Sequence, residues 1–296
     1  MGELQTIASA QEIAAAELPR EAAPRPVLKI TPPSRWFELR LGELWAYREL
    51  LYFFVWRDVK VRYKQTVVGV AWVVVQPLLT MVVFTLIFGR VAKIDSEGLP
   101  HSVFYFAATL PWNYFATALQ NATAIVAGNQ TVITKVYFPR LTLPISAVLS
   151  GLVDFAIGFV VLLGMVLAYG IRPGPAALWL PALLLLAILT ALGAGLWLSA
   201  LNALYRDVHY VVPFLVQFWM VASPVIYPST YLPQRWRWLY GLNPMAGVIE
   251  GFRWALTGHG QPPGALLLAS SAAVVLVLLG GWLFFQRMES TVADLV

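Results

Sequence analysis

The residues able to bind an anion gather in one short stretch of the sequence. Arg57, Lys60 and Lys64 recur at spacings of three and four, which places them on one face of a helix, and Arg62 lies among them. Guanidinium and ammonium groups form charge-assisted hydrogen bonds with phosphate oxygens. The cluster therefore predicts either contact with phosphate-bearing headgroups or simple anchoring of a basic segment on the cytosolic side of a membrane.

The side chains of a catalytic site are largely missing. The sequence has no cysteine, which excludes thiol nucleophiles, disulfides and Cys-ligated metals. The three histidines (His101, His209 and His259) fall in expected loops or at helix ends, and no HExxH or paired carboxylate lies within an apolar run. We expect no metal site and no cofactor in this chain. It also lacks the GxxxxGK[ST] loop that holds ATP phosphates, so ATP hydrolysis would need another chain.

Asp154 is the one firm candidate for an ionisable group within an apolar segment. Such groups carry the coupling ion in proton- or sodium-driven carriers. The same residue can instead pair with a polar group across a helix contact, or lie near the inner leaflet. A coupled secondary carrier therefore remains an alternative to a permease driven by a partner, and a membrane glycosyl- or acyltransferase is a third alternative.

The elements that position these residues must be membrane helices. Hydrophobic residues make up 59% and charged residues 12% of the 296, and the mean hydropathy is +0.70. A soluble protein of this composition could not cover its surface with polar side chains, so lipid must be the solvent. Half of the basic residues precede the first long apolar run. The net charge of +5 therefore indicates a cytosolic flank facing anionic lipid, and no nucleic acid is expected as a partner.

Two segments precede that first apolar run. Residues 1–34 are rich in Ala, Glu and Pro, show no secretory signal pattern and are expected to form a flexible cytosolic tail. Residues 35–66 carry the basic face and also an apolar face, on which Tyr47, Leu51 and Phe54 recur at helical spacing. This pattern predicts an interfacial amphipathic helix that lies in the plane of the membrane.

Residues 67–287 are expected to form a six-helix transmembrane domain, followed by a cytosolic tail over 288–296. Each span has the length of about 20 residues that a bilayer requires. Fourteen of the twenty Lys and Arg residues fall on the side of the termini, which favours cytosolic termini. We thus predict an all-α, multi-pass protein of the bacterial inner membrane. The six expected spans cover 67–91, 103–127, 143–169, 176–204, 211–227 and 265–285.

Two connecting segments are unusual for plain loops. The outer segment 228–263 is too apolar to be solvated and too interrupted to span, and within it Asn243 and Pro244 predict the start of a short helix. We expect this segment to re-enter the outer leaflet, where irregular backbone is tolerated only against protein or a water-filled cavity. The inner segment after Asn129 is long and half-apolar. It predicts a short helix parallel to the membrane that docks into a soluble partner.

The residues around the first span carry a family resemblance. The run from Arg57 to Thr80 resembles the beginning of the type-2 ABC exporter permeases for polysaccharides, in which R-Y-x-x-T-x-x-G leads to W-x-x-x-x-P. Three later stretches, ALNALYRDVHYVVPF, SPVIYP and LNPMAGVIEGFRWAL, also resemble that family. The likeness covers about residues 45–287, and O-antigen and teichoic-acid export permeases share the pattern. The residues that match the first motif are Arg62, Tyr63, Thr66, Gly69, Trp72 and Pro77.

The resemblance implies a homodimeric pore that works with two P-loop ATPase subunits, on which ATP and Mg would bind. It implies that a lipid-linked glycan, often carried on undecaprenyl pyrophosphate, moves from the cytosol to the outer side of the membrane. The long Ala/Pro/Glu tail departs from the shorter amino termini of the family. Within the same class, export of a drug or a lipid is the nearest alternative.

For an exporter of this kind we predict roles for three sets of residues. Arg57, Lys60, Arg62 and Lys64 are the candidates for binding the pyrophosphate headgroup. A path for glycans should carry aromatic rings and few fixed charges, and its candidates are Trp112, Tyr114, Phe115, Trp219 and Tyr227. The same rings would also fit an interfacial aromatic belt. The candidates for docking the ATPase are Thr134, Lys135, Val136, Tyr137 and Phe138.

Overall fold

The computed structural model describes residues 41–64, 67–259 and 262–295, and every regular element in these ranges is a helix. The all-α prediction is confirmed for this part of the chain. The expected tail over residues 1–34 and the first residues of the expected interfacial helix lie outside the described residues.

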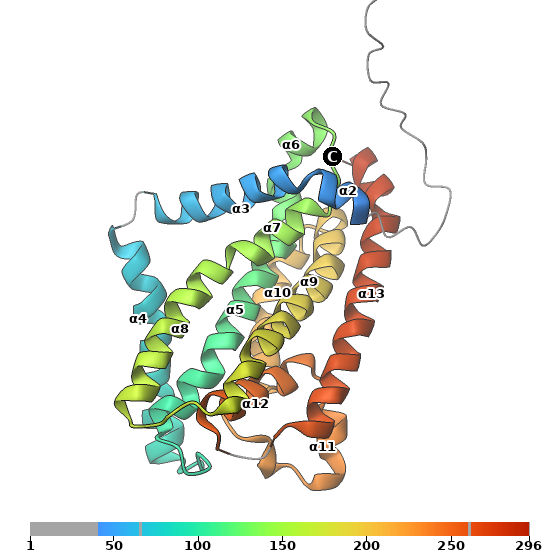
Figure 1. The fold of residues 1–296 in the computed structure, drawn as a ribbon. Helices are drawn as coiled ribbons and strands as arrows, with labels where there is room; N and C mark the ends of the chain where they lie inside the picture. Colours follow the sequence, from blue (N-terminus) through green and yellow to red (C-terminus); the bar gives the residue numbers. More distant parts are fainter. Residues whose placement is uncertain (1–40, 65–66, 260–261, 296) are drawn as a thin grey trace, which may run out of the picture. The chain divides into compact units, whose positions relative to one another are not determined.

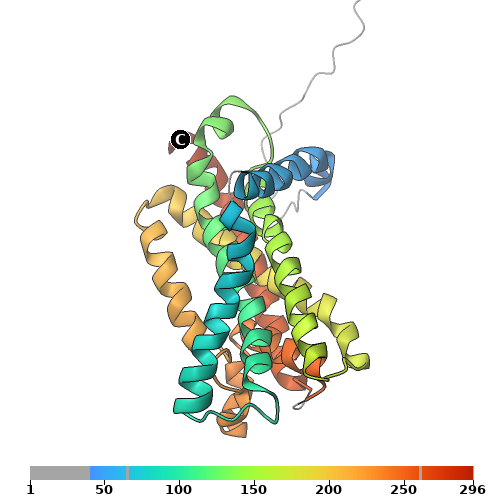
Figure 2. The ribbon, with the colours of Figure 1, turned by 90° about the vertical axis from the view of Figure 1, so that its left-hand side faces the viewer.

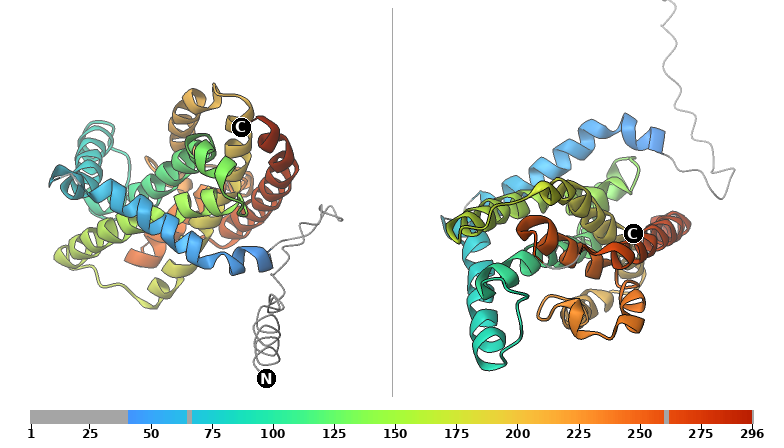
Figure 3. Two further views of the ribbon diagram at one scale, coloured as in Figure 1. Left: turned by 90° about the horizontal axis from the view of Figure 1, so that it is seen from above. Right: turned by 60° about the horizontal axis from the view of Figure 1, so that its bottom comes forward.

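The segment predicted to lie in the membrane interface forms two helices, α2 (Leu41–Ala46) and α3 (Arg48–Tyr63). α3 runs across one end of the helix bundle, nearly at right angles to the long helices (Figures 1 and 3). We call this the α3 end. Phe54 is buried beneath α3, while Phe53 and Trp56 are exposed on it. Apolar residues therefore occupy more than one face, which suits a helix held between protein and lipid better than one facing water.

The long helices occupy the expected positions, with differences at a few ends. The third expected span is divided at Gly151, and the last helix continues to Leu295 through most of the expected tail. The fifth ends at Val221, before residue 227, in the stretch where Pro224 and Pro228 interrupt regular hydrogen bonding. These helices are α4 (Val67–Phe84) with its π-helical extension η1 (Thr85–Val91), α5 (His101–Gly128), α7 (Thr142–Ser150), α8 (Leu152–Ala168), η2 (Pro175–Trp179) with α9 (Leu180–Leu204), α10 (Val208–Val221) and α13 (Gly264–Leu295).

Several of these helices are suited to a bilayer. Among the described residues four segments are long and apolar enough to cross a membrane: Ala71–Val91, Thr142–Ala168, Pro175–Leu204 and Gly264–Met288. α5 has 28 residues but carries amide and hydroxyl side chains that lower its hydropathy. α10 is apolar but has only 14 residues. The chain is accordingly a multi-pass membrane protein.

The core of the bundle lies around α5, α9, α12 and α13. α9 and α13 run side by side over much of their length and approach each other closely through glycine (Figure 1). A Cβ atom on Gly193 would lie 2.8 Å from the Cα atom of Leu278, and one on Gly281 would collide with the carbonyl oxygen of Gly193. Small residues allow such close backbone contact in membrane helices. α4 and its extension η1 do not belong to this core, because no residue of Ala71–Val91 is buried. Figure 2 shows α4 at the front of the bundle.

Shorter helices occupy the two ends of the bundle. At the end opposite α3, which we call the α12 end, the chain forms η3 (Ser229–Tyr231), α11 (Gln234–Tyr240) and α12 (Pro244–Thr257) (Figure 1). The expected cap of α12 is confirmed, because Asn243 Oδ1 accepts a hydrogen bond of 3.1 Å from the amide of Met245. At the α3 end, α6 (Gln130–Lys135) is the short helix expected in the inner segment.

Candidate functional site

Arg57 is held at the α3 end by contacts with several elements. Its guanidinium donates to Asp58 Oδ1 at 2.8 and 3.0 Å and to Asn129 Oδ1 at 3.3 Å, and it lies 4.9 Å from the ring centroid of Phe54. Asn129 in turn donates 2.8 Å to the carbonyl of Ile125 in α5. Arg57 therefore joins α3 to the end of α5, at the point where α6 begins.

A second polar group joins α3 to α8. Asp154 accepts hydrogen bonds from the Arg62 guanidinium and from the Tyr63 hydroxyl. The Arg62 and Asp154 side chains are 29% and 24% exposed, so water or a ligand can reach the pair. Burial, together with the hydrogen bond to Asp154, raises the pKa of Tyr63 well above its usual value, which keeps its hydroxyl a donor. Asp154 thus pairs with polar groups across a helix contact, one of the two expectations for this residue.

The other two basic candidates point elsewhere. Lys60 is exposed and its ammonium lies 4.3 Å from the ring centroid of Trp56, while Lys64 is exposed at the end of α3. Arg57 and Arg62 of the four predicted headgroup residues line a cavity formed by described residues. That cavity, which we call the basic mouth, has a volume of about 580 Å³ and lies between α3, α5 and α7; Arg57, Asp58, Arg62, Asn121, Asn129 and Ser150 line it.

A second cavity continues from the basic mouth. It has a volume of about 540 Å³ and lies between α4, α5 and α8, which contact one another. Arg62 and Asn121 line both cavities. We call the second one the amide cavity, because its polar lining consists mainly of the side chains of Gln76, Asn113, Thr117, Gln120 and Asn121.

These amides are not among the residues predicted from the sequence, although a signal was present. Position 117 lies four residues from 113 and 121 and three from 120 along α5, so the four positions share one helix face. Carboxamides repeating on one face of an otherwise apolar helix are expensive in lipid unless they meet a polar partner. The pattern could have been found by looking for amides at helical spacing as well as for charges.

Two of the aromatic candidates are part of the core. Trp112 and Phe115 are buried, and the Phe115 ring centroid lies 4.9 Å from that of Trp219 in an edge-on contact between α5 and α10. Trp219 is also fixed at its polar end, because its indole N–H donates 2.9 Å to Asn243 Oδ1. These three rings link α5, α10 and the beginning of α12.

The remaining two aromatic candidates lie apart from each other. Tyr114 lines the amide cavity and donates 3.2 Å to the carbonyl of Val148. Tyr227 lies near the α12 end and donates 3.1 Å to the carbonyl of Val221. The structure therefore does not gather the five rings into one surface, and only Tyr114 borders a described cavity.

The predicted docking segment is largely open at the α3 end. Thr134 and Lys135, at the end of α6, are exposed, and Val136 and Tyr137 are 54% and 60% exposed. Phe138 is 5% exposed, because its ring packs 5.6 Å from the ring of Phe54 in α3. The segment thus combines an open surface with a buried contact to the helix that carries Arg57 and Arg62.

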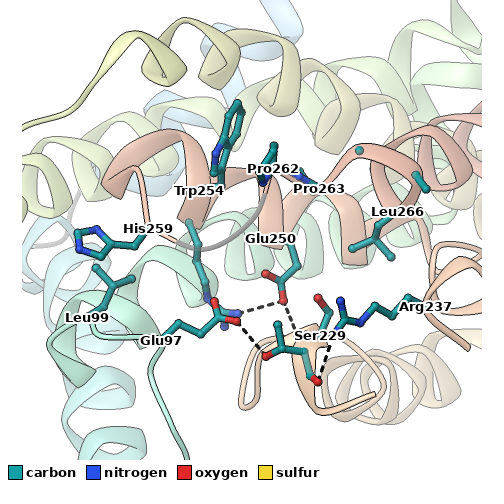
Figure 4. Close-up of a pocket in the computed structure, with 14 residues that line it drawn as sticks. Glu97, Leu99, Ser229, Arg237, Glu250, Trp254, His259, Pro262, Pro263 and Leu266 are labelled. Atoms are coloured by element: carbon teal, nitrogen blue, oxygen red, sulfur yellow. Dashed lines mark hydrogen bonds and ion pairs between the residues drawn. The ribbon is translucent and has the colours of Figure 1, made fainter. Parts of the chain in front are cut away.

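A third cavity, of about 340 Å³, lies at the α12 end (Figure 4). On its floor Arg253 pairs with Glu250 at 3.5 Å and donates to the carbonyls of Pro224 and Val225 at 2.5 and 3.0 Å. Glu250 also accepts 2.8 Å from the amide of Ser229. Burial raises the pKa of Glu250, while Arg253 and Ser229 lower it. Arg253 and Glu250 each have several partners within the chain, so the arrangement of these two is that of a structural clamp.

The two cavities at the α3 end can bind an anionic group beside a neutral polar one. They are lined by two guanidinium groups, the two carboxylates of Asp58 and Asp154 that pair with them, and a row of carboxamides. Such groups suit the recognition of a polar ligand and the compensation of its charge. Within the described ranges no three His, Asp or Glu side chains come together to hold a metal ion.

Comparisons with known proteins identify the family of this chain. The family described as ABC-2 type transporter matches residues 49–257. The chain is 32% identical to an O-antigen export system permease protein, RfbA, of Myxococcus xanthus over 222 residues, which cover 74% of this chain and 85% of that protein. It is 28% identical to an RfbA of Klebsiella pneumoniae, over 69% and 79% of the two chains.

A more distant relative is the inner membrane transport permease YadH of Escherichia coli K12. The identity is 27%, over 65% of this chain and 79% of that protein. The resemblance drawn from the motifs of the first span is therefore confirmed, and it extends through α12. The match over most of the chain, together with the extent of the similarity to the Myxococcus protein, shows that the chain belongs to the ABC-2 type transporter family.

Proposed function

We propose that this chain is the transmembrane permease subunit of an ATP-driven exporter that moves a lipid-linked, O-antigen-like polysaccharide from the cytosol across the bacterial inner membrane. The observation that carries the proposal is the similarity to a permease named for O-antigen export, which covers 85% of the length of that permease. The cavities support it, because an anion site beside a neutral polar site suits a glycan attached through phosphate.

The proposed topology has six spans, formed by α4, α5, α7 with α8, α9, α10 and α13. Both termini and the α3 end would face the cytosol, since the excess of Lys and Arg lies on that side. α11 and α12 would re-enter the outer leaflet. The many internal contacts of α12 support this, because non-helical backbone at that depth must be satisfied by protein.

Arg57 and Arg62 would bind the pyrophosphate of the lipid carrier, with Lys60 and Lys64 adding positive potential at the interface. The aromatic rings of Trp112, Tyr114, Phe115, Trp219 and Tyr227 remain the proposed glycan path. Because Trp112 and Phe115 are buried in this structure, that role would require the contact between α5 and α10 to open during transport.

Energy would come from two P-loop ATPase subunits, on which ATP and Mg bind, docked on two copies of this chain. The exposed surface of Lys135, Val136 and Tyr137 supports docking there. The contact between Phe138 and Phe54 offers a route from the docked ATPase to α3. The unburied apolar surface of α4 is available to a second copy.

The test is reconstitution of the chain with its ATPase subunit in proteoliposomes. We expect ATP-dependent movement of a lipid-linked glycan, and the double variant Lys135→Ala/Tyr137→Ala should hydrolyse ATP without transport. Replacing Arg172, an exposed cation outside the docking segment, by Ala is the control. Transport that needs no ATPase but follows an ion gradient and requires Asp154 would overturn the proposal in favour of a coupled carrier.

A further inference from the structure

The amides that line the amide cavity lack side-chain partners among the residues that the structure describes. Gln76, Asn113, Gln120 and Asn121 make no side-chain hydrogen bond with any other residue that the structure describes. Asn113, Gln120 and Asn121 are half-buried, and Gln76 is exposed across from them on α4. A carboxamide moved from water into an apolar medium without hydrogen bonds costs several kcal/mol, so this face must meet water or a polar ligand.

The chemistry of the lining selects the kind of ligand. Each carboxamide offers both donors and acceptors, which is the combination that a sugar hydroxyl requires. Among the described residues, the charged side chains that line the cavity are Arg62 and Asp154, and these two are paired. Trp72 lines the same cavity and is 53% exposed, so its ring can pack against the C–H face of a sugar.

The size and position of the cavity agree with that ligand. A volume of about 540 Å³ lies within the ~300–1,000 Å³ range of sites for small molecules. Arg62 and Asn121 are shared with the basic mouth, so one molecule can place a phosphate in the mouth and a ring in the amide cavity. We propose that the amide cavity is a saccharide-binding site that holds the sugar directly attached to the carrier phosphate.

This proposal rests on the proposed function and deepens it, because it places the sugar contact on amides of α5. A second copy of the chain is a poorer occupant of this face. Its natural contacts would be the apolar surfaces, such as Val75, Leu79 and Val82 of α4 or Phe214 and Phe218 of α10, all of which are exposed. The amide face instead continues into a cavity that carries two guanidinium groups.

The experiment compares two probes on the chain assembled with its ATPase in lipid nanodiscs. One probe is undecaprenyl pyrophosphate carrying a single N-acetylglucosamine, and the other is undecaprenyl pyrophosphate alone. Asn113→Leu and Gln120→Met remove amides while keeping similar volume. We expect each variant to bind the sugar-bearing probe about tenfold more weakly and the bare probe unchanged, because one buried hydrogen-bonding group is lost. Gln130→Met, outside the cavity on α6, should change neither affinity.

Several results would overturn the inference. Equal weakening for both probes would mean that the amides do not read the sugar. Unchanged binding of both probes, or a loss of dimer in the variants measured by native mass spectrometry, would give the face to structure or to a second copy. If the variants bind both probes like the wild type, and the wild-type assembly still transports glycan, the saccharide site is wrong but the proposed function stands. The proposed function itself fails only if the wild-type assembly moves no glycan in the presence of ATP.

Discussion

Two arginine–carboxylate pairs lie at opposite ends of this bundle, and they differ in almost every physical respect. At the α12 end, the Arg253 and Glu250 side chains are 3% and 12% exposed. At the α3 end, the Arg62 and Asp154 side chains are 29% and 24% exposed. Both pairs border a cavity, but Arg253 also donates to two backbone carbonyls, whereas Arg62 lines two cavities and Asp154 lines one of them.

The difference separates a structural role from an exchange role. A buried ion pair offsets a large desolvation cost only when every remaining donor and acceptor is satisfied, and removing one partner leaves an uncompensated charge. A half-exposed pair is worth little to stability, because water can replace either partner. A phosphate can therefore compete with Asp154 for Arg62 at small cost, while a ligand for Arg253 would have to replace its bonds to Glu250 and to two backbone carbonyls.

The strongest way to break this comparison is Arg253→Ala. The variant leaves the buried carboxylate of Glu250 and the carbonyls of Pro224 and Val225 without their donor, so we expect a loss of about 3–5 kcal/mol in the free energy of unfolding. Thermal unfolding in detergent, together with the amount of protein in membranes, measures the loss. Arg172→Ala is the control, since Arg172 is exposed. Equal stability of the two variants would contradict the clamp.

Glu250→Gln should have a smaller effect, of about 1 kcal/mol near neutral pH, because glutamine still accepts from Ser229 and the lost attraction to Arg253 is offset by the lower cost of burying a neutral group. Burial raises the pKa of Glu250, so the folded state binds a proton more readily than the unfolded chain. The wild type should therefore gain stability relative to Glu250→Gln as the pH falls from 7 toward the usual pKa of about 4.3 for glutamate. Unfolding midpoints at several pH values provide the test, and a difference that grows with rising pH would have the wrong sign.

The contrast between the pairs also marks what sequence patterns can and cannot predict. Helices follow from local features: the apolar runs predicted α4 and α13, and the Asn243–Pro244 dipeptide predicted the start of α12. The link between Arg62 and Asp154 joins residues 92 positions apart. It depends on how α3 crosses the bundle, which no local pattern encodes.

Side-chain roles were harder to predict than helices for a related reason. Aromatic residues near the end of a span fit a lipid belt, a glycan path or a packed core equally well by type. Trp112 and Phe115 prove to be buried because α10 brings Trp219 against them. The amides of α5 carried a usable signal in their spacing, but which helices face them is known only from the fold.

Asp154→Asn sharpens the comparison from the other side. We expect a change of about 1 kcal/mol or less in stability, because the pair is half-exposed. Binding of undecaprenyl pyrophosphate should tighten several-fold, since the carboxylate of Asp154 no longer competes with the phosphate for Arg62. Asp207→Asn, at an exposed position, is the control. Weaker binding, or a loss of stability like that of Arg253→Ala, would show that Asp154 holds Arg62 in place instead of competing for it.

Tyr63→Phe should have the smallest effect of these variants. It tests whether the Tyr63 hydroxyl, and not only the charge of Asp154, affects the binding of phosphate at Arg62. The hydroxyl donates to Asp154 but carries no charge, because its pKa is raised by burial and by that same hydrogen bond. Removing it should cost about 0.5–1 kcal/mol in stability, the lower part of the range for one hydrogen bond, since water can reach the carboxylate. Binding of undecaprenyl pyrophosphate, measured as for Asp154→Asn, should change less than twofold because Arg62 keeps its partner. Tyr63→Phe could instead tighten binding as much as Asp154→Asn does. Arg62, Tyr63 and Asp154 would then act as one hydrogen-bonded unit. In that case the Arg62–Asp154 pair could not be compared by itself with the Arg253–Glu250 pair.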